Sequence, residues 1–167
     1  MSDALRLPAL DPASLPELRG SGYPEPYKSR MGDRVKRRLG PALGLTQFGV
    51  NLVRLGPGGQ SALRHWHTHE EEFVYLLEGE LVLRTDAGEQ VLRAGDCAGY
   101  PAGNGDGHQL VNRGDSVAVY LEVGTRDDDD EAHYPDDDLL LRYQQVAQPD
   151  GGSRREMLPL HKDGRPY

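Results

Sequence analysis

The sequence contains a single cysteine, Cys97, so the chain cannot form an internal disulfide. This scarcity is typical of proteins that work in a reducing compartment. A lone cysteine within a β-rich segment usually behaves as a small apolar residue. We therefore expect Cys97 to be buried on a strand, and we assign it no catalytic role.

Long apolar runs are absent as well. No stretch approaches the roughly 18 consecutive apolar residues that a membrane helix requires. The first ten residues also lack the basic start and apolar core of a secretory signal. We therefore expect a cytoplasmic protein with no membrane partner.

An excess of positive charge is also lacking. The formal net charge is -8, from 19 basic and 27 acidic residues. Eight of the acids lie in two short runs at 127–131 and 136–138, and outside these runs 19 acidic residues balance the 19 basic ones. The absence of a net positive charge argues against a nucleic-acid partner. Neither acidic run has the alternating ligands and central glycine of a calcium loop, so we interpret both as solvated surface. One basic run, Arg34 to Arg38, predicts a solvated turn or a contact with an anion.

Glycine and proline are plentiful, with 21 and 12 residues, in a chain of 167 that is sufficient for one domain. Residues 1–44 show no sustained period, so they predict an extended arm with a short strand or helical turn. Residues 45–125 predict the barrel core. Residues 126–167 predict an acidic loop, a late strand or short helix at Leu139 to Val146, and a tail that wraps the barrel or frays.

Short β-rich segments follow one another from Leu45 onward, separated by turns rich in Gly, Asp and Asn. Eight strands in sequential hairpins suffice to close a small barrel. No amphipathic helix separates them, which argues against a parallel α/β sheet. The predicted strands are Leu45 to Leu55, Ser61 to Trp66, Glu72 to Glu78, Leu81 to Arg84, Glu89 to Leu92, Asp96 to Tyr100, Gln109 to Asn112 and Val117 to Val123.

The segment from Glu72 to Glu78 is apolar on both faces. Glu72 shares one face with two aliphatic residues, while Phe73, Tyr75 and Leu77 share the other. Neither face is suited to water, so the second face needs a cover. The N-terminal arm, the C-terminal segment or a second subunit can supply it, and we expect a homodimer.

Histidines gather in the segment from Gly59 to Gly79. In an extended strand, His65 and His67 point to the same side, about 6.5 to 7 Å apart along the backbone. A tight turn after them would bring back a carboxylate from Glu70, Glu71 or Glu72 on an antiparallel neighbour. Of these three residues, only Glu72 lies on the same strand face as Val74 and Leu76, which we expect to point inward.

A fourth ligand can come from His108, which follows the glycine-rich loop PAGNGDG. Neutral imidazoles and one carboxylate suit a divalent ion of Fe, Mn, Ni, Co, Zn or Cu, and they leave positions open for water or substrate. Without a metal, the same residues would form a hydrogen-bonded polar cluster or hold an organic ligand directly. We expect His69 to be a non-ligand, because it falls in the predicted turn.

Two motifs in this region resemble those of the cupin superfamily. The first, G(x)5HxH(x)3-4E(x)6G, is met at every spacing by Gly59, His65, His67, Glu72 and Gly79. The second, G(x)5PxG(x)2H(x)3N, is met by Gly95, Pro101, Gly103, His108 and Asn112, with one departure. Four residues separate Gly103 from His108 where two are usual, so the loop Asn104 to Gly107 is enlarged.

The resemblance implies an all-β fold, a double-stranded β-helix or jelly-roll-like antiparallel barrel, here with an extended N-terminal arm. It also implies a divalent metal in the barrel mouth on His65, His67, Glu72 and His108. The sequence is similar to bacterial single-domain cupins, some of which are labelled sugar-phosphate isomerases by fold analogy. Fold alone does not fix function.

Three functions follow as hypotheses. The first is a metalloenzyme acting on a small molecule, as an oxygenase or a sugar-phosphate isomerase. The second is a non-catalytic protein of the same fold that binds a small metabolite, and the third is an interaction module that uses the apolar outer strand face. No helix-turn-helix accompanies the predicted barrel, which argues against a self-contained transcription regulator. Four further residues receive no catalytic assignment: Gln47, Arg64, Trp66 and Tyr100.

Overall fold

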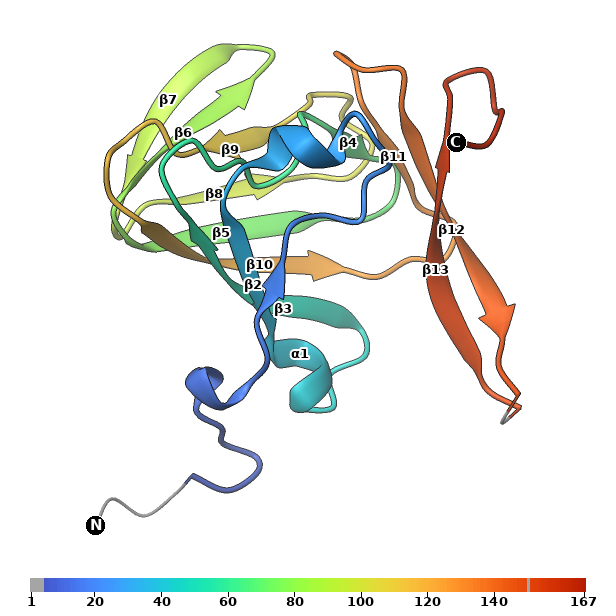
Figure 1. The fold of residues 1–167 in the computed structure, drawn as a ribbon, viewed down its shortest axis with the longest axis horizontal. Coiled ribbons are helices and arrows are strands. Elements are labelled where there is room, and N and C mark those ends of the chain that lie inside the picture. The colour runs from blue at the N-terminus through green and yellow to red at the C-terminus, as the bar shows by residue number, and fades with distance from the viewer. Residues whose placement is uncertain (1–4, 150) are drawn as a thin grey trace.

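The computed structural model describes residues 5–149 and 151–167, and most of its regular secondary structure is antiparallel strand (Figure 1). The helical elements are short: η1 (Pro12–Ser14), η2 (Lys28–Met31) and α1 (Leu39–Ala42). The strands are β1 (Leu18–Arg19), β2 (Arg34–Arg38), β3 (Phe48–Leu55), β4 (Trp66–His67), β5 (Glu72–Glu78), β6 (Glu80–Thr85), β7 (Gly88–Arg93), β8 (Cys97–Tyr100), β9 (Gln109–Val111), β10 (Ala118–Thr125), β11 (Glu131–His133), β12 (Leu140–Ala147) and β13 (Ser153–Leu160).

Three sheets enclose the barrel. The largest has the order β1-β2-β3-β10-β5-β8, the smallest has the order β7-β6-β9, and the third runs β13-β12-β11-β4. The predicted all-β double-stranded β-helix is confirmed. The predicted pairing in sequential hairpins is wrong for most of the barrel, because β10 lies between β3 and β5, and β9 pairs with β6. Side-chain alternation indicates which face of a strand is buried, but it does not identify the neighbouring strand.

The chain before the histidines is less regular than predicted. The expected strand Ser61 to Trp66 is wrong, because regular pairing covers only Trp66–His67. Ser61 and His65 instead make isolated backbone contacts, donating to the carbonyls of Leu110 and His108 at 2.9 and 3.1 Å. β4 then pairs with β11, and the expected pairing with the Glu72 strand is also wrong. The other seven predicted strands are present, with bounds shifted by three residues or fewer.

A core of aliphatic side chains fills one end of the barrel between the largest and smallest sheets. Truncating such a residue to alanine typically costs about 2–5 kcal/mol. This packed end therefore holds the strands of both sheets in fixed positions. Its buried members are Val53, Leu55, Val74, Leu76, Leu81, Leu83, Leu92, Leu110, Ala118 and Tyr120.

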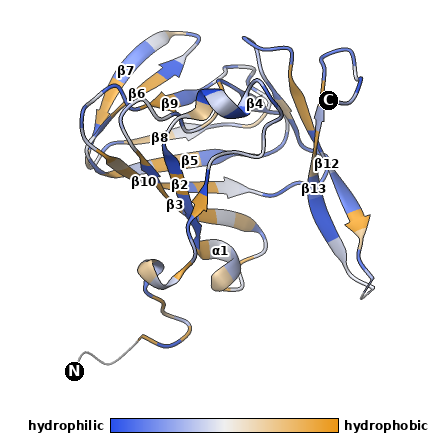
Figure 2. Ribbon diagram, in the orientation of Figure 1, coloured by the Kyte–Doolittle hydropathy of each residue, from blue (hydrophilic) through white to orange (hydrophobic). Residues whose placement is uncertain are grey.

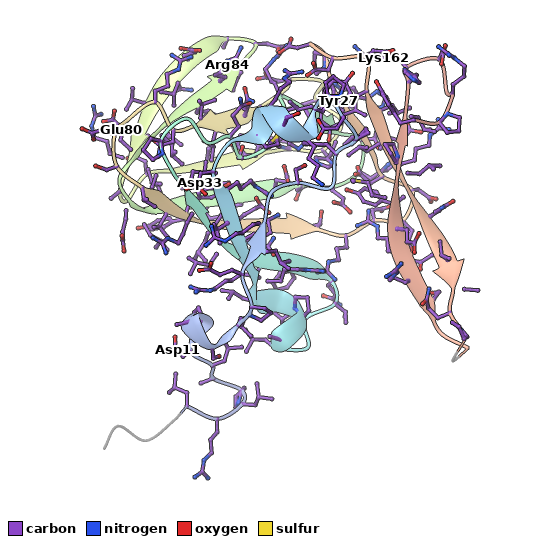
Figure 3. The ribbon with its side chains drawn as sticks, in the orientation of Figure 1. Asp11, Tyr27, Asp33, Glu80, Arg84 and Lys162 are labelled. Carbon is purple, nitrogen blue, oxygen red and sulfur yellow. The ribbon has the colours of Figure 1, made fainter. Side chains whose placement is uncertain are left out.

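A second cluster ties both chain ends to the barrel. From the arm it takes Met31, which is 1% exposed, and Tyr27, labelled in Figure 3. From the C-terminal segment it takes Tyr134 and Leu139. The first four residues of the predicted arm lie outside the described residues. The division of the chain at 44/45 and 125/126 stays a prediction.

Two segments predicted as irregular are strands. The basic run Arg34–Arg38 is β2, paired with β3, so the predicted solvated turn is wrong. The tail forms β13, which pairs with β12 along a long hairpin beside the barrel (Figure 1). Each segment pairs with the strand nearest to it in the chain, and the polar composition of the segment alone does not reveal that pairing.

The outer face of β5 stays open to solvent. Phe73, Tyr75 and Leu77 are 42%, 39% and 41% exposed, so neither the arm nor the tail covers them. Cys97 is also exposed, and the expectation that it is buried is wrong. It lies opposite Tyr75 in the sheet and therefore shares this outward face. Among the described residues, no helix is long and apolar enough to cross a membrane.

Candidate metal centre

Three histidines reach the same end of the barrel from different elements. His67 belongs to β4, while His65 precedes that strand and His108 precedes β9. His65 and His108 exchange two backbone hydrogen bonds, with N···O distances of 3.1 and 2.8 Å. This pairing fixes the position of His108 despite the enlarged loop before it. Each of these three residues is between 6% and 8% exposed.

The ring nitrogens converge on one carboxylate oxygen. Oε2 of Glu72 lies 2.8 Å from Nε2 of His108, 3.7 Å from Nε2 of His65 and 3.8 Å from Nε2 of His67. Ligand atoms of His65, His67 and Glu72 all lie within 4.8 Å of one another. The structure thus brings together all four residues that the motifs singled out.

Hydrogen bonds at Nδ1 fix the orientation of two rings. Nδ1 of His65 lies 2.8 Å from the carbonyl oxygen of Leu63, and Nδ1 of His67 lies 2.6 Å from Oδ2 of Asp130. Both partners accept, so in the neutral form of either ring the proton sits on Nδ1 and the lone pair on Nε2. The Nε2 lone pairs of His65 and His67 therefore face the carboxylate of Glu72. A divalent cation placed between them would bind both the nitrogens and the carboxylate. The residues present fit such an ion.

The protonation states of His65 and Glu72 agree with that donor set, whereas the pKa of His67 is raised, because burial is outweighed by the hydrogen bond to Asp130. Burial, together with the neighbouring His108, lowers the pKa of His65 to about 3, so its ring is neutral near pH 7. Burial by itself would raise the pKa of Glu72. The hydrogen bond from His108 and the neighbouring imidazoles outweigh it and hold that pKa well below its usual value. Glu72 is therefore a carboxylate at neutral pH.

Asp130 was missed by the sequence reasoning, which placed the whole acidic run on the solvated surface. That interpretation is wrong for this residue, which is 1% exposed. Its Oδ1 accepts from the backbone N–H groups of His69 and Glu70, at 2.9 and 3.1 Å. Burial opposes ionisation, but these bonds and His67 lower its pKa to about 2. No signal in the run DDDDE distinguishes Asp130 from its three neighbours.

Glu70 and Glu71, the carboxylates considered as alternatives, do not take the place of Glu72 among the three histidines. Glu71 is exposed, and Glu70 is engaged by the guanidinium of Arg155 at 2.7 Å and the backbone N–H of Asp127 at 3.0 Å. Glu70 also approaches His67 and Asp130 closely enough to form a second group of ligand atoms. His69 is exposed, and its Nδ1 lies 2.9 Å from the hydroxyl of Thr68.

Of the four unassigned residues, Tyr100 lies closest to the histidines. Its ring stacks on that of His108, with centroids 3.6 Å apart and planes within 2°. Its hydroxyl is buried and lacks a partner among the described residues. Trp66 instead stacks on His133, Arg64 forms ion pairs with Asp136 and Asp86, and the side chain of Gln47 is exposed.

The histidine cluster opens on a cavity of about 420 Å³. Its walls come mainly from β2, β3, β10 and β5 on one side, and from β12 and β13 on the other. This volume suits a small metabolite. The lining is rich in charged and hydroxyl-bearing side chains, among them Arg34, Lys36, Glu122 and Tyr120.

Comparison with known proteins identifies the family of this chain. The sequence profile of the Cupin domain family matches residues 51–124. A crystal structure of a cupin-superfamily sugar phosphate isomerase from Silicibacter pomeroyi is 45% identical in sequence, covers 96% of each chain and has a TM-score of 0.84. The chain belongs to the cupin superfamily. This cupin shares its fold with that solved relative over 96% of its length.

Two further relatives of this cupin are more distant. A protein assigned as a sugar phosphate isomerase in Acidithiobacillus ferrooxidans is 31% identical, with 75% of this chain and 76% of that chain covered and a TM-score of 0.63. Quercetin 2,3-dioxygenase of Bacillus subtilis is 28% identical over 151 residues, which are 81% of this chain and 44% of the dioxygenase. The chain spans about half the length of the curated relatives it matches.

Proposed function

We propose that this cupin is a metal-dependent enzyme that acts on a small, oxygen-rich molecule, with isomerisation of a sugar phosphate as the favoured reaction class. The observation that carries this proposal is the convergence of three imidazole Nε2 atoms on the carboxylate of Glu72 at the wall of a 420 Å³ cavity. A purely structural metal site is fully coordinated by protein side chains and needs no cavity beside it.

His65, His67, Glu72 and His108 would hold the ion. When bound, a divalent metal in such a site polarises a substrate oxygen and offers exchangeable positions to it. The chain's own contribution is to keep these four side chains in place before substrate arrives. The carbonyl of Leu63 and the carboxylate of Asp130 do this for two of the rings, through their Nδ1 atoms.

Tyr100 supplies a hydroxyl near the cluster. Burial raises the pKa of this phenol, and the charge of Glu72 raises it further, so the group stays protonated at neutral pH. Because the hydroxyl has no partner among the described residues, it is free to donate to an oxygen of a bound molecule. Its ring also covers His108 and shields that side of the cluster from water.

The polar cavity wall favours an isomerase over an oxygenase. An isomerase that acts on a sugar phosphate needs to hold hydroxyl and phosphate oxygens, and guanidinium and hydroxyl donors suit them. The two relatives assigned as sugar phosphate isomerases support the same class. Oxygenase chemistry is the second candidate, and the Bacillus subtilis dioxygenase supports it.

The test has two parts. Elemental analysis of protein purified without added metal should find about one divalent ion per chain. The metal-loaded protein, incubated with a panel of aldose and ketose phosphates, should then convert one member to its isomer, as followed by NMR. Tight binding of a panel member without product would instead indicate a metabolite-binding protein. Absence of any bound metal, even after reconstitution, would refute the proposal.

We also propose that the chain works as a cytoplasmic homodimer. The exposed face formed by Phe73, Tyr75 and Leu77 is the feature that supports a second subunit. Association of two such faces would remove apolar surface from water. The sheet edge at β8 lies beside this face and would take part in the contact.

A further inference from the structure

The basic residues of β2 form one wall of the cavity, although the histidine cluster does not use them. Arg34, Lys36 and Arg38 alternate along the strand, so all three share a face. Lys36 lies opposite Val53 of β3, which in turn lies opposite Tyr120 of β10. This register places the three cations on the inner face of the largest sheet. The hydrophilic colouring of β2 in Figure 2 marks the same run.

Much of this positive charge is not neutralised by the protein. Lys36 pairs with Glu122 at 2.8 Å, and Arg155 pairs with Glu70 at 2.7 Å. Within residues 5–149 and 151–167, no carboxylate lies within ion-pair distance of three other cavity-lining guanidinium groups. These belong to Arg34, Arg38 and Arg126.

The backbone leaves room for one of these groups. Arg126 follows β10, and its guanidinium lies over Gly49 of β3, where an added Cβ would meet Nη2 at 3.7 Å. The neighbouring residue on β10 is Gly124, which also lacks a side chain and lines the cavity. Two glycines on adjacent strands thus keep the space beneath Arg126 open.

Unpartnered donors point to a missing acceptor. Nε of Arg34 and the hydroxyl of Tyr120 are buried and have no hydrogen-bond partner among the described residues. Tyr120 is 1% exposed, and burial raises the pKa of its phenol far above the usual value, so it remains a donor. Buried donors without acceptors are costly, and such groups in a cavity indicate an oxygen-bearing ligand.

We propose that Arg34, Arg38 and Arg126, with the hydroxyl of Tyr120, form an anion subsite that binds the phosphate group of a phosphate monoester. This inference rests on the proposed function. It assigns a binding site to the phosphate end of the substrate, whose other end would lie at the histidine cluster. Guanidinium forks match phosphate oxygens in pairs. A phosphate monoester carries about two negative charges at neutral pH. It therefore neutralises several unpaired cations better than a carboxylate, which carries one charge.

The separation of the two ends limits the size of the ligand. β2 and β5 are three strand spacings apart in the largest sheet, or about 14 Å at the usual 4.8 Å per strand. The three arginine side chains line the cavity, so the distance from their guanidinium groups to the histidine cluster is shorter than this strand separation. A phosphate monoester of a short polyhydroxy chain spans what is left, with its far oxygens at the histidine cluster.

The first experiment measures binding of inorganic phosphate by calorimetry to the chelator-treated, metal-free protein. We expect saturable binding that weakens about tenfold or more in Arg34→Gln and in Arg126→Gln, since each loses a charge-assisted contact. Arg37→Gln is the matched control. It lies on the same strand but on the opposite face, bonded to Glu17 at 3.0 Å, so phosphate binding should be unchanged.

The controls separate this inference from the proposed function. Phosphate that binds only the metal-loaded protein, with the arginine variants unaffected, would place the anion on the metal and overturn the inference. Metal content is measured in the same samples. Protein that keeps phosphate binding but never binds metal would refute the proposed function while leaving the subsite intact.

Competition identifies the chemical class. Ribose 5-phosphate should displace inorganic phosphate, whereas ribose should not, and acetate should compete far more weakly. Equal competition by acetate would indicate a general carboxylate site and overturn the assignment to phosphate. Displacement by no phosphate monoester would limit the site to the free ion, which also contradicts the proposal. Each variant is checked by circular dichroism and thermal melting to establish that it is folded.

Discussion

The carboxylate of Asp130 holds His67 by a hydrogen bond of 2.6 Å to Nδ1, and the carboxylate itself is fully buried. A carboxylate in this position fixes the ring's tautomer and raises the basicity of Nε2. Its other oxygen accepts from two backbone N–H groups in the turn before β5. One side chain therefore orients a proposed ligand and also holds the turn that leads to Glu72.

Replacing this carboxylate should weaken metal binding without abolishing it. In Asp130→Asn the amide nitrogen cannot accept from Nδ1, so we expect metal affinity to fall about 10- to 100-fold. Folding stability should fall by about 1–3 kcal/mol, because a buried group loses its partner. Competition with a chromophoric chelator and urea unfolding measure the two effects. Asp129→Asn, an exposed neighbour, should change neither, and an equal effect there would contradict the assigned role.

The two histidines at positions 67 and 69 offer a matched comparison. His67→Ala should abolish stoichiometric metal binding and turnover together, since it removes one of three converging nitrogens. His69→Ala should leave both unchanged, because that ring is exposed and bonded only locally. Elemental analysis and the isomerase assay provide the readouts. Full turnover by metal-free His67→Ala would show that the chemistry lies elsewhere.

Acid should reveal the contribution of Glu122 to stability. Burial would raise the pKa of this carboxyl, but Lys36 and Arg34 outweigh it and the pKa is lowered. A depressed folded-state pKa means that the stabilisation is present above the unfolded value, near 4.5, and is lost as pH falls through the folded value. Glu122→Gln should therefore be less stable than the parent at pH 7, and the difference should shrink as pH falls below about 4.

The measurement is urea unfolding of chelator-treated protein between pH 7 and pH 3. Glu89→Gln is the control, because Glu89 also has a lowered pKa but pairs with Arg113 on the open surface. Surface pairs contribute little, so we expect a much smaller change at every pH. A stability difference for Glu122→Gln that stayed constant across this range would argue against the electrostatic origin.

The outer face of β5 provides a test of the proposed dimer. Tyr75→Glu and Leu77→Glu place a charge on the exposed apolar face, so each should shift the protein toward monomer. Leu18→Glu changes a residue that is 47% exposed on β1 and should leave association unchanged. Sedimentation velocity over a range of concentrations reads out the oligomeric state. A parent protein that is monomeric throughout would contradict the proposal.

Local spacing was sufficient to predict the four residues of the cluster. His65 and His67 share a side because strand side chains alternate, and the motif spacing selected Glu72 and His108. Such patterns are visible in sequence because each depends on residues close together in the chain. The irregular path from Ser61 to His65 did not alter the outcome, since the backbone pairing with His108 holds the segment in place.

The partners of those residues were not predictable in the same way. Asp130 lies 63 residues from His67 in the sequence. The inner face of β2 can be recognised only once β3 and β10 are known to lie beside it in the sheet. Neither the acidic run nor the basic run carries a local signal that separates a buried member from a solvated one. Burial depends on which strand packs alongside, and crossovers of the barrel decide that.

The sequence by itself determined the all-β fold, the inward face of the Glu72 strand and the residues of the proposed metal centre, because side-chain alternation and short-range spacing encode them. Tertiary structure alone decided which strands are neighbours, that Asp130 is buried against His67, and that the cations of β2 line a cavity shared with the histidines. Contacts between distant segments arise from the packing of whole sheets, and no local stretch of the chain specifies that packing.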